Sequence, residues 1–182
     1  VEDGVTTFAP AQRANHVVLG VEHRLGERYL IRAEVYRKEL DGLRPRFENL
    51  FDPLAILPEL EPDRARIAPD GAAARGIELS LAYADSAATQ WWASYVYAHA
   101  TDQVAGESVA RSWDQRHAAQ VGVARESGRW DFGAVLAYHS GWATTGLTLQ
   151  QSAAGTTTAV IGPRNAQRVG RFSSLDLPAK RG

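Results

Sequence analysis

Apolar and polar residues alternate along much of the chain with a repeat of two. Residues 28–36 give the clearest example, with apolar side chains at every second position: Tyr29, Ile31, Ala33 and Val35. The positions between them include three charges: Arg28, Arg32 and Glu34. A period of two puts these sets on opposite faces of a β-strand, whereas a helix would scatter the charges around its axis.

The same period predicts strands at residues 16–25, 76–84, 90–99, 115–125, 129–139 and 169–177, about seven in all. Proline has no backbone N–H, so Pro178 should end regular pairing in the last of them. Most of these segments are about nine to eleven residues long, the length of a tilted strand across a hydrocarbon layer of about 30 Å. Strands of soluble proteins more often have about five or six residues.

The connections between these segments differ in length in a regular way. Short turns are predicted at residues 26–27, 85–89 and 126–128, and long polar loops at about 41–74, 101–115 and 141–168. The first loop holds five of the eight prolines of the chain: Pro45, Pro53, Pro58, Pro62 and Pro69. A helix at 103–113 is disfavoured by Gly106 and by poor apolar spacing. Short turns at one end and long loops at the other are typical of outer-membrane barrels.

Aromatic residues lie close to the ends of the predicted strands. Those near the short turns are Tyr29, Tyr83, Trp91 and Trp130, and those near the long loops are Tyr97 and Tyr138. Rings in these places suit the aromatic belts of a membrane barrel. The competing interpretation is that the same rings pack the core of a β-sandwich.

We therefore predict an all-β fold, an antiparallel up-and-down transmembrane β-barrel segment with short periplasmic turns and long extracellular loops. The charges on the other face should line the lumen as an ion-pair lattice: Arg28, Arg32, Glu34, Glu78 and Asp131. A Lys or Arg facing lipid at the bilayer centre costs about 2 to 4 kcal/mol, so these charges constrain the register.

Composition narrows the function classes. The net charge of −1 gives no electrostatic case for binding to nucleic acid or to an anionic membrane surface. No stretch reaches the 18 or so apolar residues of a spanning helix. The absence of Cys excludes disulfides, thiolate metal sites and a cysteine nucleophile. An exported protein needs a signal sequence, and the chain begins at Val1 without one, so we expect a processed piece or an excised segment.

Four short motifs stand at matching places relative to the strands and loops. They are RFENLF at 46–51, RGIELS at 75–80, RSWDQRH at 111–117 and YHSGW at 138–142. In this order they resemble the β-barrel of TonB-dependent outer-membrane receptors. The Gly76-x-Glu78 and Asp114–His117 runs carry most of the resemblance, which covers nearly the whole chain.

The resemblance implies a location in the outer membrane of a Gram-negative cell. Such receptors have a barrel of about 22 strands closed by an amino-terminal plug. They import siderophores, cobalamin, haem or sugars with energy passed from the inner membrane. Residues 1–182 would be a late, partial β-barrel domain, without the plug or the energy-coupling segment. The implied partners are the remaining barrel strands, the plug, the TonB energy-transducing complex, outer-membrane lipid and a small-molecule cargo.

The function expected is uptake of a scarce nutrient, with a ferric siderophore as the leading cargo and no cofactor. Four arginines of the first long loop are the candidate ligand-binding residues, because guanidinium groups bind anionic chelates: Arg44, Arg46, Arg64 and Arg66. Acidic residues are interspersed among them, so local pairing is the favoured alternative.

No catalytic or metal site is predicted, so the chain is not expected to be an enzyme. Asp114, Arg116 and His117 are close in sequence, but in an extended segment His117 points away from the other two. They are therefore expected to form a structural polar cluster at a strand end. None of the five histidines has a metal-binding spacing, although His99 and His139 could approach one another through the fold.

Two other functions remain open. A self-contained small outer-membrane barrel could bind a partner through its loops, with an eighth strand hidden in residues 1–13 or 144–161. A soluble lipocalin-like β-barrel binder, or a β-sandwich enzyme, would instead turn its aromatic face inward.

Overall fold

The computed structural model describes residues 11–84, 88–151, 153 and 155–181. Over these residues the chain is made of β-strands and one turn of 3-10 helix, η1 (Pro58–Leu60). All strand pairs in them are antiparallel. The predicted all-β, antiparallel class is confirmed. None of the described helical structure has the length and apolar character needed to cross a membrane.

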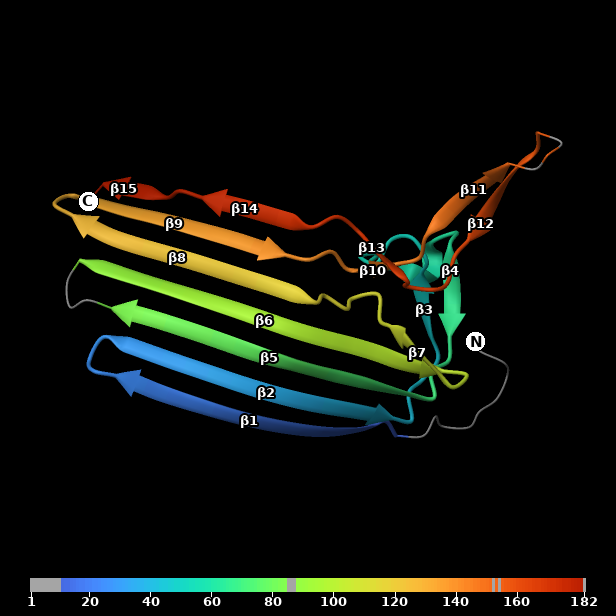
Figure 1. Cartoon of the computed structure of the whole chain (residues 1–182), viewed down its shortest axis with the longest axis horizontal. Helices are drawn as coiled ribbons and strands as arrows, with labels where there is room; N and C mark the ends of the chain where they lie inside the picture. Colours follow the sequence, from blue (N-terminus) through green and yellow to red (C-terminus); the bar gives the residue numbers. More distant parts are fainter. Residues whose placement is uncertain (1–10, 85–87, 152, 154, 182) are drawn as a thin grey trace.

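One large sheet dominates the fold, and its long strands lie side by side (Figure 1). Its order is β1 (Arg13–Leu25), β2 (Tyr29–Asp41), β5 (Gly71–Ala84), β6 (Thr89–Val104), β8 (His117–Ser127), β9 (Trp130–His139) and β14 (Phe172–Asp176). β7 (Glu107–Ala110) pairs with β6, and β15 (Ala179–Arg181) pairs with β9. No pairing joins β1 to β14 among the described residues, so the sheet they form is open.

All seven predicted strand segments are strands, but the first four are longer than predicted. β1, β2, β5 and β6 have 13, 13, 14 and 16 residues. The ladders of β2 and β6 continue into polar positions, such as residues 37–41 of β2, and that of β5 continues into the small residues 71–74, so the alternation of apolar and polar residues is lost there. The periodicity marked only the apolar part of each strand.

The seventh predicted strand, residues 169–177, corresponds to β14, and a further strand that was not predicted, β15, follows Pro178. Pro178 donates no hydrogen bond, although its carbonyl accepts one from the N–H of Gly133 at 2.8 Å. Pairing with β9 then resumes at Ala179. The proline interrupts the strand without ending it.

The long predicted loops contain short strands, and the sequence had indicated a strand within them only at residues 144–161. The pairs are β3 (Arg46–Asn49) with β4 (Arg64–Ile67), β10 (Ala143–Thr144) with β13 (Gln167–Arg168), and β11 (Leu147–Gln151) with β12 (Thr157–Ile161). Each has only two to five residues, too few for a periodicity to show. The helix at 103–113 is absent as predicted, since β7 occupies that place.

The register collects the apolar residues of the sheet on one side. Ile31 is opposite Leu81, which is opposite Ala93, and the row continues through Val121 to Leu136. Directly opposed residues share a face. We call this side of the sheet the apolar face.

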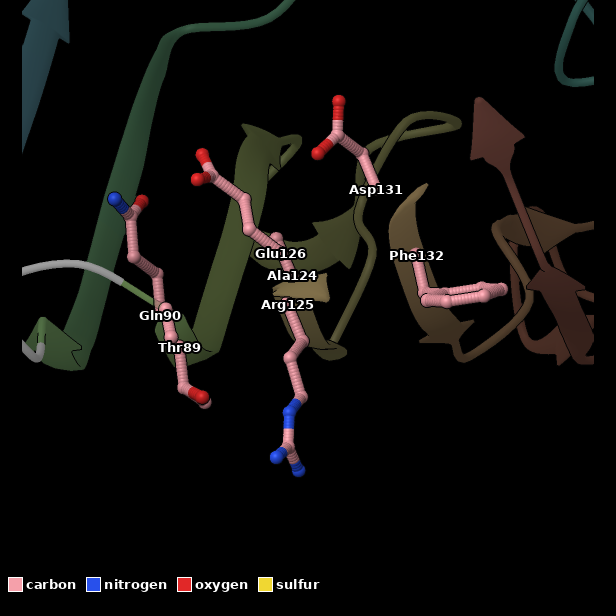
Figure 2. A pocket seen from close by; sticks show the side chains of 8 residues that line it. Thr89, Gln90, Ala124, Arg125, Glu126, Asp131 and Phe132 are labelled. Atoms are coloured by element: carbon pink, nitrogen blue, oxygen red, sulfur yellow. The ribbon is translucent and has the colours of Figure 1, made fainter. Parts of the chain in front are cut away.

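The other side, the polar face, carries the predicted lumenal charges of the strands. Arg32 and Glu34 pair there through Arg32 Nη2 and Glu34 Oε1, 2.6 Å apart, and Glu78 lies directly opposite Glu34. Figure 2 shows the alternation at the short-turn end, where Glu126 and Asp131 point to one side and Arg125 to the other. The residues drawn line a hollow of about 150 Å³. Residues 85–87 of the second predicted short turn lie outside the described residues.

Aromatic rings gather on the apolar face near the short turns. Tyr29 and Tyr83 have ring centroids 4.9 Å apart, and Trp91 stacks on Tyr83 at 5.7 Å. Towards the other end of the strands, the hydroxyl of Tyr95 lies 2.9 Å from Nδ1 of His117. The rings therefore form two groups, one near each end of the apolar face.

Buried residues are few, and none packs a core against the middle of either sheet face. The buried apolar side chains of the described chain are Ile67, Ala72, Ala100 and Ala143. They belong to the loop end of the sheet. By contrast, Leu19 is 72% exposed and Leu136 is 50% exposed. The sheet therefore offers two open faces, one apolar and one polar.

Candidate functional site

The three long connections fold together at the end of the sheet opposite the short turns (Figure 1). We call the segments 43–70, 107–116 and 141–170 the cap. The hairpin β11–β12 projects from it. The cap and the adjoining strand ends contain all the buried polar residues of the described chain: Glu48, Asn49, Asp102, Ser112, Asp114, Thr145 and Asn165.

Asp102, on β6, is the centre of the first charge cluster. Its side chain is completely buried, and Nε of Arg111 donates to its Oδ1 at 2.8 Å. Arg46 of β3 pairs with its Oδ2. A buried carboxylate needs such partners, because removing it from water costs several kcal/mol.

Glu48 extends this cluster to the third connection. Its Oε1 pairs with Arg46, and its Oε2 accepts a hydrogen bond of 2.7 Å from Nη1 of Arg164. Nη2 of Arg164 lies 3.7 Å from Oδ2 of Asp102. Three arginines and two carboxylates thus join all three segments of the cap, and positive charge is in excess.

Asp114 is the centre of the second charge cluster and is 1% exposed. Its Oδ1 accepts a 2.6 Å hydrogen bond from the N–H of Ala100 and lies 3.2 Å from Nδ1 of His99. Its Oδ2 accepts from Nε of Arg116 at 2.8 Å and pairs with Arg168. At Ala100 the carboxylate therefore replaces the backbone acceptor that a neighbouring strand would provide to β6.

These partners set the charge state of Asp114. Burial acts to raise its pKa, but the hydrogen bonds from Ala100, Arg116, Arg168 and His99 outweigh burial and hold the pKa below its ordinary value. The same contacts stabilise the guanidinium of Arg116: burial acts to lower its pKa, but the hydrogen bond and charge of Asp114 raise it. Asp114 and Arg116 are therefore both ionised at neutral pH.

Backbone contacts fix the third connection against the rest of the cap. Nη1 of Arg168 donates to the carbonyl of Asp114 at 2.6 Å and to that of Gly141 at 3.0 Å. A Cβ at Gly141 would lie 1.7 Å from the carbonyl oxygen of Val169, so only glycine allows this approach. The side chain of Asn165 donates to the carbonyl of Ala110 at 2.8 Å.

The chemistry of the cap is that of charge pairing. As the sequence predicts, Asp114 and Arg116 contact one another, and His117 bonds to Tyr95 instead. His99 contacts Asp114, whereas His139 stacks on Phe172 with centroids 5.0 Å apart. Within the described ranges, no group of three or more His, Cys, Asp or Glu side chains is placed to hold a metal ion.

The four candidate ligand-binding arginines occupy different environments. Arg44 is exposed in the segment between β2 and β3. Arg46 pairs with Glu48, which is the local pairing that the sequence favoured, and also with the distant Asp102. Arg64 and Arg66 are exposed on β4, on the face of the β3–β4 hairpin opposite Arg46. The structure therefore does not bring the four together into one site.

Sequence reasoning missed the partners that arrive from distant segments. Arg164 and Arg168 lie in a stretch predicted as a long loop, where no local pattern marks them, and Arg111 stood out only as the first residue of the RSWDQRH motif. The sequence did contain a weak signal for two of the ion pairs, because residues two apart in an extended segment lie on the same side. These pairs are Arg46 with Glu48 and Asp114 with Arg116.

No family model matches the chain, and a search of curated proteins finds no significant match.

Proposed function

We propose that this chain is a transmembrane segment of an outer-membrane β-barrel that takes up a scarce nutrient, in the manner of TonB-dependent receptors. The cargo we propose is a ferric siderophore. The supporting observation is the register of the large sheet, which collects apolar side chains along one face and puts Arg32, Glu34 and Glu78 on the other. The motifs of the sequence analysis add the receptor class and the cargo.

The exposure of the apolar face favours lipid as its surroundings. Ile31, Leu79 and Leu136 are 42%, 46% and 50% exposed, and no described element covers them. In water such a face would be costly at about 25 cal/mol per Å² of apolar surface. Acyl chains would cover it without any further protein.

The edges of the sheet favour further barrel strands as partners. β1 and β14 each present unpaired backbone groups along one side, among the described strands. In lipid each such group costs several kcal/mol, so additional strands must satisfy them. In the proposed receptor, the plug and the energy-transducing complex would act together with those additional strands.

The cap suits the extracellular side of such a barrel. Its segments are polar, and the exposed arginines Arg44, Arg64 and Arg66 remain available to an anionic iron chelate. Arg46 would contribute indirectly, by holding β3 in place.

The two alternative functions require different arrangements of this sheet. A self-contained small barrel requires β1 to pair with the other edge of the sheet. A soluble lipocalin-like binder requires the apolar face to surround a dry interior, whereas this face is open along its length.

A cysteine scan of β2 tests the membrane assignment, because the chain contains no cysteine and each introduced thiol is unique. Cysteines at Ile31, Ala33 and Val35 would carry an environment-sensitive fluorophore in phosphatidylcholine vesicles. We expect blue-shifted emission and quenching by lipid-bound nitroxide at these positions. Cysteines at Arg32 and Glu34 are the matched controls.

The controls should instead be quenched by aqueous iodide. Uniform iodide quenching at all five positions would reject membrane insertion. Protection of the apolar positions without lipid quenching, in a chain that stays monomeric without detergent, would favour the lipocalin-like alternative.

A further inference from the structure

Basic residues form a row at the loop end of the apolar face. Arg37 of β2 is directly opposite Arg75 of β5, which is directly opposite His99 of β6. Val35 and Ile77 belong to the neighbouring row on the same face, so the basic row lies immediately beyond the apolar residues.

The two arginines repel each other in this arrangement. Like charges directly opposed on neighbouring strands destabilise a sheet. Arg37 has one carboxylate partner, Glu39, with Arg37 Nε 2.9 Å from Glu39 Oε1, but the side chains are 73% and 48% exposed. Such an exposed pair contributes little. Arg75 is exposed and forms no ion pair with any residue in the described chain.

A hollow of about 210 Å³ lies over this row. Arg37, Arg75 and His99 line it together with the hydroxyl residues Thr101 and Ser108. The other lining residues are Ala73 and Ala74, which are small. The ring of His99 is held by the contact of its Nδ1 with Asp114 at 3.2 Å.

We propose that the row Arg37–Arg75–His99 binds the phosphate of an anionic lipid, whose acyl chains lie along the apolar face below it. This inference rests on the proposed membrane location. Guanidinium forks and hydroxyl groups are the donors that phosphate oxygens take, and a shared phosphate would relieve the repulsion between the arginines.

The position of the row favours a lipid over a soluble anion. Val35 and Ile77 are 45% and 44% exposed, so apolar surface continues directly from the basic row. A free phosphate would use only the cations. An amphiphile would use both the cations and the apolar surface.

Lipid retention tests this proposal. The chain would be inserted in phosphatidylcholine vesicles that contain a minor fraction of phosphatidic acid, then extracted in mild detergent, and the bound lipids identified by mass spectrometry. We expect phosphatidic acid to be enriched over its share in the vesicles. Arg37→Gln with Arg75→Gln should reduce that enrichment about tenfold.

The matched control removes two arginines from the polar face, Arg24→Gln with Arg32→Gln, and should leave the enrichment unchanged. Equal retention of phosphatidic acid by both double variants would overturn the site. Displacement of phosphatidic acid by millimolar inorganic phosphate alone would assign the row to a soluble anion instead. Circular dichroism checks that both variants keep their strands.

The outcome is separable from that of the proposed function. A chain that fails to insert even in pure phosphatidylcholine contradicts the membrane location, and the lipid site with it. A chain that inserts but shows no preference for phosphatidic acid contradicts the lipid site alone.

Discussion

At the scale of single residues, two buried carboxylates organise the cap. Asp102 and Asp114 are 0% and 1% exposed, yet each is surrounded by arginines. Removing one partner of a buried pair is far more costly than removing both, because the remaining charge stays buried without compensation. The carboxylates should therefore be the most sensitive positions of the cap.

The first prediction concerns the substitution Asp102→Asn. It leaves Arg46 and Arg111 without their common anion, so the free energy of unfolding should fall by about 3 to 5 kcal/mol. Urea unfolding of the vesicle-bound chain, followed by tryptophan fluorescence, measures this change. Asp131→Asn, at an exposed position on β9, is the control and should cost less than about 1 kcal/mol. Equal effects would show that Asp102 does not stabilise the cap.

The second prediction concerns pH and Asp114. Its pKa is lower in the folded chain than in the unfolded chain, so its contribution to stability is complete above the unfolded value of about 4 and is lost as pH falls through the folded value. Proteolysis of the cap should be slow from neutral pH to about pH 5 and should accelerate below about pH 4. A protease active at neutral pH and pepsin in the acid range provide the measurement, each referred to its cleavage of an unfolded substrate at the same pH.

The control for this pH dependence is Asp114→Asn. It should cleave faster than the natural chain at neutral pH and should show a smaller acceleration at low pH. An unchanged acid response in Asp114→Asn would assign the acid response to other carboxylates, among them Asp63, whose pKa is also lowered: burial acts to raise it, but hydrogen bonds, the largest from Asn49, outweigh burial.

At the scale of elements, the strands of the large sheet could be predicted from sequence, because alternation over many residues has one structural interpretation. The ends of β2 and β6 could not be predicted, because their backbone pairing continues through polar positions where the alternation is lost. The cap could not either: its strands are short, and its ion pairs join residues as far apart as Arg164 and Glu48. Local patterns carry no information about such partners.

Packing between strands gives the third prediction, at Gly122 on β8. A Cβ there would lie 2.6 Å from ring atoms of Trp92 on the neighbouring strand. Gly122→Ala should therefore displace the ring and cost about 1 to 3 kcal/mol. A double-mutant cycle with Trp92→Ala measures the coupling, and the second substitution should recover part of the loss.

The control for this substitution is Gly20→Ala, where the closest atom is Cγ of the flexible Glu34 side chain at 3.1 Å. It should cost less than about 1 kcal/mol. If the losses in free energy of unfolding from Gly122→Ala and Trp92→Ala simply add, the ring of Trp92 does not pack against Gly122.

At the scale of the whole molecule, the large sheet formed by the described residues is open, with unpaired edges at β1 and β14. β5 and β6 have a strand on each side along most of their length, whereas β1 has only β2. The described chain therefore has a stable centre and an edge that needs further strands. This organisation supports our proposal that the chain forms part of a barrel.

The fourth prediction follows from this unequal pairing. Amide hydrogen exchange of the chain in detergent micelles should be slowest in β5 and β6 and fastest in β1, because edge strands open at lower free energy. Mass spectrometry of peptic fragments resolves these strands. Exchange in β1 as slow as in β5 would mean that β1 pairs with another strand, from a second copy or from residues outside those described.

The contact between Arg164 and Glu48 spans 116 residues of sequence, and the one between Arg46 and Asp102 spans 56. Contacts of such separation form slowly, because a long chain must first be brought to a common point. The hairpins at the short turns have no such requirement. Folding should therefore begin at the short turns and end at the cap. Until Arg164 reaches the cap, Asp102 has an incomplete set of counter-ions.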